Sequence, residues 1–225
     1  MIKNKNFVIP KIEVKYSILR DVQTYFRQQP VSYPKNIDEA LKKFLPQKIF
    51  LVLKIPNLSQ KKKEKILQNY LKLYYKRKKY KFDEAIQKFK NFWAGNGAAI
   101  IKELEEIYQI KLIFKKFKIY MITFPRCPYN YKEKWFAVNV FGAPNHQLDI
   151  AKHELNHFFF HKKFNAKKKE IGIEIFNKIK ESFTIISLPK EKGYQNHQNL
   201  RKNIKKWHKE KKSLNEIFKL AKNIN

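Results

Sequence analysis

Two histidines and a glutamate lie within five consecutive residues, His153-Glu154-Leu155-Asn156-His157, and match the pattern HExxH. On a helix, residues four positions apart share one face, so both imidazoles can reach a single metal ion from successive turns. The intervening Glu154 projects toward the same cleft, near enough to take a proton from metal-activated water without binding the metal itself. This spacing predicts a catalytic site for one metal ion, with zinc as the expected metal.

A catalytic zinc site needs a third protein ligand, which leaves the fourth position for water. His161 continues the histidine series but lies about 12 Å along the helix from His153, too far for both to bind one ion, so we expect it to support the site or line the cleft. Glutamates on the following helix are the other source. Glu181 is our choice, because a carboxylate within the apolar run 179–186 is costly to bury unless a cation or hydrogen bonds meet it. Glu174, seven residues earlier on about the same face, is the alternative.

The run HELNHFFFH at 153–161, followed by ESFTIISLP from Glu181, resembles the gluzincin class of zinc metallopeptidases. It is more narrowly similar to the ImmA/IrrE-type peptidases within that class, over about 40 residues of the chain. The resemblance implies one zinc ion per chain, held by His153, His157 and Glu181. It also implies hydrolysis of peptide bonds in a peptide or protein substrate, with Glu154 as the general base.

Further site residues are expected on either side of this core. In gluzincins a histidine or tyrosine from a later segment often stabilises the oxyanion, and Tyr194 and His197 follow the break at Pro189 to Gly193. An exposed strand edge at 135–141 is a candidate for pairing with an extended peptide. Cys127 has no identifiable histidine partner, so we expect a buried small residue there and no thiol nucleophile.

The elements that must position these residues are mainly helices. Apolar residues at helical spacing predict helices at 17–28, 36–45, 61–80, 83–93, 98–110, 146–163, 168–188 and 197–222, with a turn at Gly95-Asn96-Gly97. Extended segments are predicted at 49–55, 111–124 and 135–141. We therefore expect an α+β fold that is mostly helical, with a helical N-terminal part (1–110) and a catalytic part (111–225), or one domain combining both. By the resemblance, the catalytic part would be zincin-like, with a small antiparallel sheet beside the HExxH helix.

The formal charge of +31 favours contact with polyanions, so nucleic acid is a second expected partner through lysine-rich stretches near 61–80 and 201–212. All but five of the 50 basic residues are lysine, alongside abundant asparagine and isoleucine, a composition typical of coding bias. Base-reading surfaces lean instead on arginine. The competing hypothesis is a basic nucleic-acid-binding protein in which the motif is structural or incidental.

Cellular context is indicated by two further features. A single cysteine, Cys127, cannot form an internal disulfide, and residues 1–16 contain no continuous apolar segment typical of a signal peptide. No run approaches the roughly 20 apolar residues that a membrane helix requires. We expect a cytoplasmic protein without a membrane partner.

Overall fold

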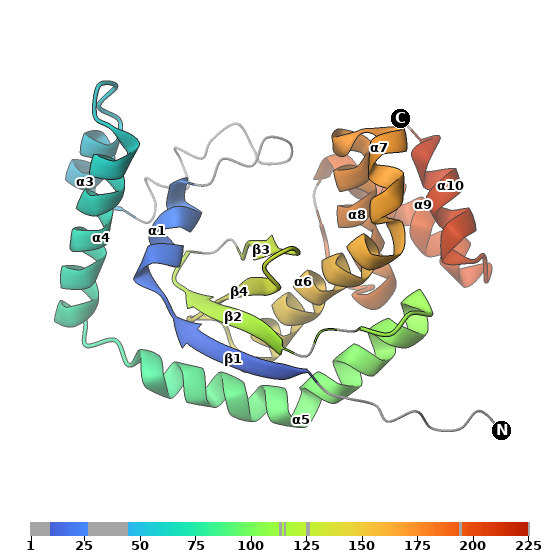
Figure 1. Ribbon diagram of the computed structural model, residues 1–225, viewed down its shortest axis with the longest axis horizontal. Helices are drawn as coiled ribbons and strands as arrows, with labels where there is room; N and C mark the ends of the chain where they lie inside the picture. The colour runs from blue at the N-terminus through green and yellow to red at the C-terminus, as the bar shows by residue number, and fades with distance from the viewer. Residues whose placement is uncertain are drawn as a thin grey trace.

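The chain folds into nine helices and one four-stranded sheet within the part described by the computed structural model, which comprises residues 10–26, 45–112, 114, 116–124, 127–193 and 195–224. The predicted α+β class with mostly helical content is confirmed. The helices are α1 (Ile18–Phe26), α3 (Gln47–Leu53), α4 (Gln60–Arg77), α5 (Phe82–Tyr108), α6 (Pro144–Phe164), α7 (Lys168–Ile171), α8 (Ile173–Ser187), α9 (Gln198–Lys209) and α10 (Leu214–Lys222). Figure 1 shows α3 and α4 at one end of the molecule and α7 to α10 at the other, with the long α5 between them.

The sheet is mixed, with strand order β1-β2-β4-β3. Its strands are β1 (Lys11–Tyr16), β2 (Lys116–Ile122), β3 (Tyr129–Asn130) and β4 (Trp135–Asn139). Both β1 and β4 run parallel to β2, and only β3 pairs antiparallel with β4. The predicted antiparallel sheet is therefore wrong. Parallel neighbours need a crossover connection, and among the described residues helices α1, α3, α4 and α5 lie between β1 and β2 along the chain.

The predicted peptide-binding edge at 135–141 is also wrong, because β4 is an inner strand. Tyr129 pairs with Phe136, and the backbone N–H of Ala137 donates to the carbonyl oxygen of Pro128 at 2.8 Å. The segment 128–130 therefore covers the side of β4 that faces away from β2. In this part of the sheet the outer edge belongs to β3.

Each face of the sheet packs against a different group of helices. Phe117, Ile119 and Phe136 point into the larger hydrophobic cluster with α5, α6 and α8. Tyr120 and Ile122 point the other way, into a smaller cluster with α1, α3 and α4. Each cluster combines residues from before and after residue 110, where the sequence suggested a boundary.

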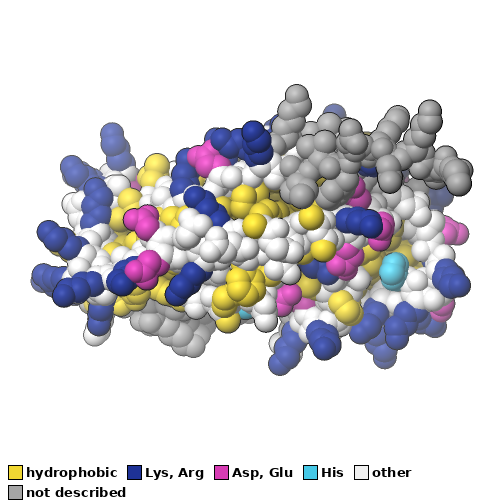
Figure 2. Space-filling model, turned by 90° about the horizontal axis from the view of Figure 1, so that it is seen from below, with side chains coloured by type: hydrophobic (Ala, Val, Ile, Leu, Met, Phe, Trp, Pro, Cys, Tyr) yellow, Lys and Arg dark blue, Asp and Glu magenta, His cyan; other side chains and the backbone are white. Residues whose placement is uncertain are grey.

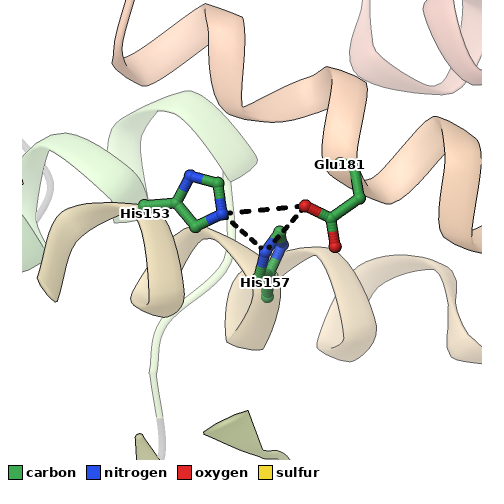
Figure 3. Close-up of side chains that lie close together, drawn as sticks. All are labelled: His153, His157 and Glu181. Atoms are coloured by element: carbon green, nitrogen blue, oxygen red, sulfur yellow. Dashed lines mark hydrogen bonds and ion pairs between the residues drawn. The ribbon is translucent and has the colours of Figure 1, made fainter. Parts of the chain in front are cut away.

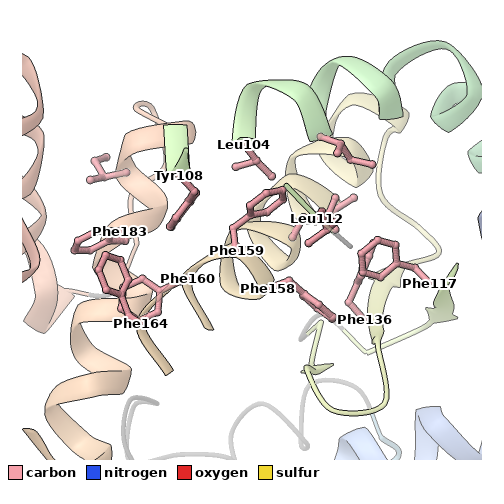
Figure 4. Close-up of a cluster of buried hydrophobic side chains, with 14 of the residues drawn as sticks. Leu104, Tyr108, Leu112, Phe117, Phe136, Phe158, Phe159, Phe160, Phe164 and Phe183 are labelled. Carbon is pink, nitrogen blue, oxygen red and sulfur yellow. The ribbon is translucent and has the colours of Figure 1, made fainter. Parts of the chain in front are cut away.

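Helix α6, which carries the HExxH motif, is the central helix of the larger cluster. Three consecutive phenylalanines leave it in different directions (Figure 4). Phe158 contacts Phe117 of the sheet at 5.4 Å between ring centroids, Phe159 contacts Tyr108 of α5 at 5.7 Å, and Phe160 contacts Phe183 of α8 at 5.1 Å. Because neighbours pack against several sides of α6, the motif sits on a rigid element.

The predicted extended segment 49–55 is instead the helix α3. Its first turn is closed by N–H groups of Ile49 and Phe50, which donate to the carbonyl oxygen of Pro46. Phe50 and Leu53, three positions apart, are buried beside α4. A short apolar run fits either a strand or a buried helix, and here contact with α4 selects the helix.

The predicted turn at Gly95 to Gly97 is wrong as well, because α5 runs unbroken through it. A continuous stripe of buried residues at helical spacing includes Phe89, Trp93, Gly97 and Ile101. A Cβ at Gly97 would lie 2.5 Å from Cε2 of Trp93, so this glycine makes room for the indole. Tertiary packing therefore outweighs the low helix propensity of glycine.

The predicted C-terminal helices are present but divided. Gly172, with φ of 79°, separates α7 from α8 inside the predicted helix 168–188. Ser213 and Glu216 form a reciprocal capping box that starts α10 and so divides the predicted helix 197–222. The predicted helix at 36–45 falls almost entirely outside the described residues.

Basic side chains dominate the outline of the molecule in Figure 2, with acidic ones scattered among them and hydrophobic ones toward the middle. Most lysines of α4 are exposed. Among the described helices, none has the length and apolar character needed to cross a bilayer.

Candidate metal centre

Both histidines of the motif lie on one face of helix α6, and their Nε2 atoms lie close together. His153 and His157 are one turn apart, and their Nε2 atoms are 3.0 Å from each other. The side chain of His157 is almost fully buried, at 2% exposed, and that of His153 is 20% exposed. The predicted sharing of one helix face is therefore confirmed, and one side of the pair reaches solvent.

Helix α8 supplies the third group, Glu181, which faces the histidines across the gap between the two helices (Figure 3). Its Oε2 lies 3.4 Å from Nε2 of His157 and 3.7 Å from Nε2 of His153. The prediction that Glu181 approaches the pair is confirmed. Glu174 is exposed in the first turn of α8 and takes no part in this cluster.

The three atoms have the spacing of ligands around one ion. Donor atoms bound at 2.0–2.1 Å to a tetrahedral ion lie about 3.4 Å from one another, and the three separations here are centred on that value. Each atom can offer a lone pair toward the same point. Such convergence is favourable only when a cation or shared protons lie between the donors.

The charge states of the three groups suit metal binding. Burial lowers the pKa of His157 to about 3, so its imidazole is neutral. Burial alone would raise the pKa of Glu181, but the neighbouring His157 and Lys180 hold it well below its usual range, so the carboxylate is ionised. For His153, burial lowers the pKa, but hydrogen bonds to Glu181 and Glu191 outweigh it, so this imidazole must release a proton when a metal binds.

Glu191, in the turn after α8, orients His153. Nδ1 of His153 donates to Oε1 of Glu191 at 2.6 Å, which leaves Nε2 directed at the cluster. The other carboxylate oxygen accepts from Thr184 at 2.6 Å and from Arg201 at 3.0 Å. A carboxylate behind a histidine ligand fixes its tautomer and ring orientation.

Arg201 of α9 in turn locks this turn onto α8. Its guanidinium also donates to the carbonyl oxygens of Glu181 and Glu191 and to Thr184. Gly193, with φ of 61°, lets the guanidinium approach, since a Cβ there would lie 2.6 Å from Cζ of Arg201. The break predicted at Pro189 to Gly193 is therefore the segment that places Glu191 beside His153.

Lys180 meets the other oxygen of Glu181. Its Nζ lies 2.9 Å from Oε1 of Glu181 and donates to the hydroxyl of Tyr129 at 2.7 Å. The Tyr129 hydroxyl is 2.9 Å from Nε2 of His161, and its ring lies 4.9 Å from that of His157. His161 therefore supports the site from one step away, as predicted, and stays outside the three-atom cluster.

Glu154 is buried beside the cluster, at 6% exposed, and its Oε2 has no hydrogen-bond partner within the described part of the chain. Burial, together with the charges of Glu181 and Glu191, raises its pKa to about 8 against the opposing charges of His153 and Lys180. Its oxygen without a partner and a pKa near neutral pH suit a group that exchanges a proton with a bound molecule.

The remaining predicted residues have separate outcomes. Tyr194 lies outside the described residues. His197 is buried just before α9 and lies near enough to Glu181 for that carboxylate to raise its pKa against the lowering effect of burial, but its nitrogens are not among the three clustered donor atoms, so its part as oxyanion donor stays a prediction. Cys127 was predicted to be buried and is partly buried, and burial together with the charge of Glu154 raises the pKa of its thiol.

Sequence reasoning missed Lys180, Glu191, Tyr129 and Arg201. The one available signal was the cost of burying Glu181, which required a cation nearby; Lys180, the preceding residue, is that cation. The other three come from segments whose approach depends on tertiary structure.

Comparison with known proteins adds no family to this geometry. No family model, no curated protein and no solved structure matches the chain. Interpretation of the site therefore rests on its own chemistry.

Proposed function

We propose that this protein is a zinc-dependent metallopeptidase, in which His153, His157 and Glu181 hold one zinc ion and Glu154 is the general base. The observation that carries the proposal is the convergence of Nε2, Nε2 and Oε2 of the three ligands at 3.0–3.7 Å, beside a buried glutamate that binds none of them. Two imidazoles and one carboxylate are a donor set typical of catalytic zinc.

A fourth coordination position is consistent with the exposure of the site. The side chains of His153 and Glu181 are 20% and 15% exposed, so one side of the cluster is open to solvent. A structural zinc site would close with four protein ligands, and here three side chains cluster within the described residues. Glu154 also has no role in a structural site.

Zinc held by His153, His157 and Glu181 would supply Lewis-acid chemistry for the substrate carbonyl and for water at neutral pH. Glu154 takes a proton from the attacking water as the new C–O bond forms, and it passes that proton to the amide nitrogen as the C–N bond breaks. Glu191 keeps His153 in the tautomer that binds through Nε2. Oε1 of Glu181 lies 2.9 Å from Nζ of Lys180, and Oε2 is the oxygen turned toward the histidines.

The test is hydrolysis of fluorescein-labelled casein and of a quenched-fluorescence peptide library by zinc-loaded protein. Wild type is compared with Glu154→Gln, and Glu174→Gln serves as the matched control because Glu174 is an exposed glutamate of α8. We expect Glu154→Gln to keep its zinc but lose about 10²–10⁴-fold in rate, while the control is unchanged. Equal rates in wild type and Glu154→Gln, or no hydrolysis by the zinc-loaded wild type, would contradict the proposal.

A further inference from the structure

Lys180 is a buried cation placed against the candidate metal centre. Its side chain is 7% exposed. Two acceptors hold the ammonium group within the described part of the chain, Oε1 of Glu181 and the hydroxyl of Tyr129, and the Tyr129 ring centroid lies 4.8 Å away. An ammonium group has three N–H donors, so one donor remains for a further acceptor.

The hydrogen-bond chain behind Lys180 fixes the direction of its donors. An ammonium can only donate, so the Tyr129 oxygen accepts from Lys180, and the Tyr129 O–H then donates to Nε2 of His161. Burial lowers the pKa of His161 to about 4, with the charge of Lys180 acting in the same direction, so this imidazole is a neutral acceptor. The hydrogen bonds from Lys180 to Tyr129 and from Tyr129 to His161 therefore hold Lys180 in place as a cation.

Lys180 offsets the buried charge of Glu181 when no metal is bound, but a bound metal ion would offset the same charge. The ammonium pairs with Glu181, but the same carboxylate is the one predicted to neutralise a metal ion. A fixed positive charge beside a metal ion opposes binding of that ion. The placement becomes favourable when additional negative charge forms between the two cations.

Lys180 also stands within electrostatic reach of the groups that would surround a substrate. The Glu181 carboxylate that it contacts at 2.9 Å lies 3.4 Å from Nε2 of His157, and the Tyr129 ring beside it lies 4.9 Å from the His157 ring. The ammonium therefore shares one small region with two proposed ligands.

We propose that Lys180 is a catalytic residue that stabilises the substrate oxyanion, the part that the sequence suggested for Tyr194 or His197. The inference rests on the proposed function. When water adds to the peptide carbonyl, the carbonyl π electrons move to oxygen, and the free N–H of Lys180 donates to that anionic oxygen. When the C–N bond breaks, the electrons return to form the new carboxyl group, and Lys180 remains protonated throughout. The ligand class is a tetrahedral anion, which phenylphosphonate mimics.

The experiment uses full-length protein loaded with cobalt(II), whose visible absorption reports anion binding without a known substrate. Phenylphosphonate is titrated into wild type, Lys180→Met, Lys180→Arg and Lys178→Met. Lys178 lies on the same helix, outside the cluster, and is the matched control for loss of one positive charge. Metal content is measured for each variant.

We expect Lys180→Met to keep one metal ion per chain but bind phenylphosphonate about 10–100-fold more weakly, with partial recovery in Lys180→Arg and no change in Lys178→Met. With a casein substrate, kcat should fall about 10²–10³-fold with little change in KM. Anion affinity within threefold of wild type in Lys180→Met would overturn the inference. Loss of metal from Lys180→Met would also overturn it, since Lys180 would then be a positioning residue for Glu181. A wild-type protein that binds no metal would instead refute the proposed function itself.

Discussion

Replacing Glu191 with glutamine tests whether the residues behind the ligands build the metal centre. The change keeps the size of the side chain but removes the charge that accepts from His153 at 2.6 Å and from Arg201 at 3.0 Å. A histidine held by a carboxylate binds metal about 10–100-fold more tightly than one without it, which corresponds to about 1.4–2.7 kcal/mol. We therefore expect zinc affinity to fall by this factor in Glu191→Gln.

The same substitution has a separate effect on the metal-free fold. The guanidinium of Arg201, whose side chain is 4% exposed, would lose the charge of Glu191, its carboxylate partner within the described residues. Breaking a buried charge pair costs about 3–5 kcal/mol, and the neutral acceptors that remain around Arg201 place the expected loss at the lower end of that range. Urea unfolding of the metal-free protein measures this loss independently of zinc.

Zinc affinity is measured by competition with a chromophoric chelator, under conditions where every variant is folded. Glu170→Gln is the matched control, because Glu170 makes only exposed ion pairs with Lys167 and Lys222. The reasoning is refuted if Glu191→Gln binds zinc within twofold of wild type, or if Glu170→Gln weakens binding equally.

Three further predictions concern other parts of the chain. Gly95→Ala should raise the free energy of unfolding by about 0.5–1 kcal/mol, because nothing lies within 4 Å of its new Cβ, whereas Gly97→Ala should lower it by about 1–3 kcal/mol by displacing Trp93; urea unfolding of both tests this. Asp21→Ala should lower the free energy of unfolding by about 3 kcal/mol, because buried donors of Thr123 and Tyr75 lose their acceptor. Zinc affinity, measured by the same chelator competition, should stay unchanged. If the exposed lysines of α4 bind polyanions, single-stranded DNA affinity measured by fluorescence anisotropy should fall steeply with salt; salt-independent binding would contradict this.

The sequence predicted the local part of the site because HExxH spacing and helix geometry depend on neighbouring residues. His153 and His157 needed only a helix to share one face, and the helix is present. Glu181 lies on another element, yet the cost of burying its carboxylate among apolar residues identified it. These three positions follow from local physics.

The supporting residues were not predictable in the same way. Glu191 reaches His153 through a turn held by Arg201, and Tyr129 reaches Lys180 from the edge of the sheet. Nothing in the spacing of these residues along the chain indicates that they meet. Their roles arise from how α6, α8, α9 and the sheet pack together.

Errors in the predicted fold have a related origin. The segment 49–55 is apolar and short, so its sequence does not distinguish a strand from the helix that forms against α4. Gly95 and Gly97 suggested a turn, but Trp93 packs over Gly97 and the helix continues. The direction of strand pairing was not predicted either, because β1 and β2 are far apart in sequence and no local pattern indicates that they pair.

The most direct test of the central claim is zinc content by elemental analysis after dialysis of metal-replete protein. Wild type is measured beside His157→Ala and Glu181→Ala, with Glu174→Ala as the control on α8. We predict about one zinc ion per chain in wild type and in the control, and loss of zinc from the other two variants. Folded wild-type protein without zinc, or zinc retained in both His157→Ala and Glu181→Ala, would contradict the account.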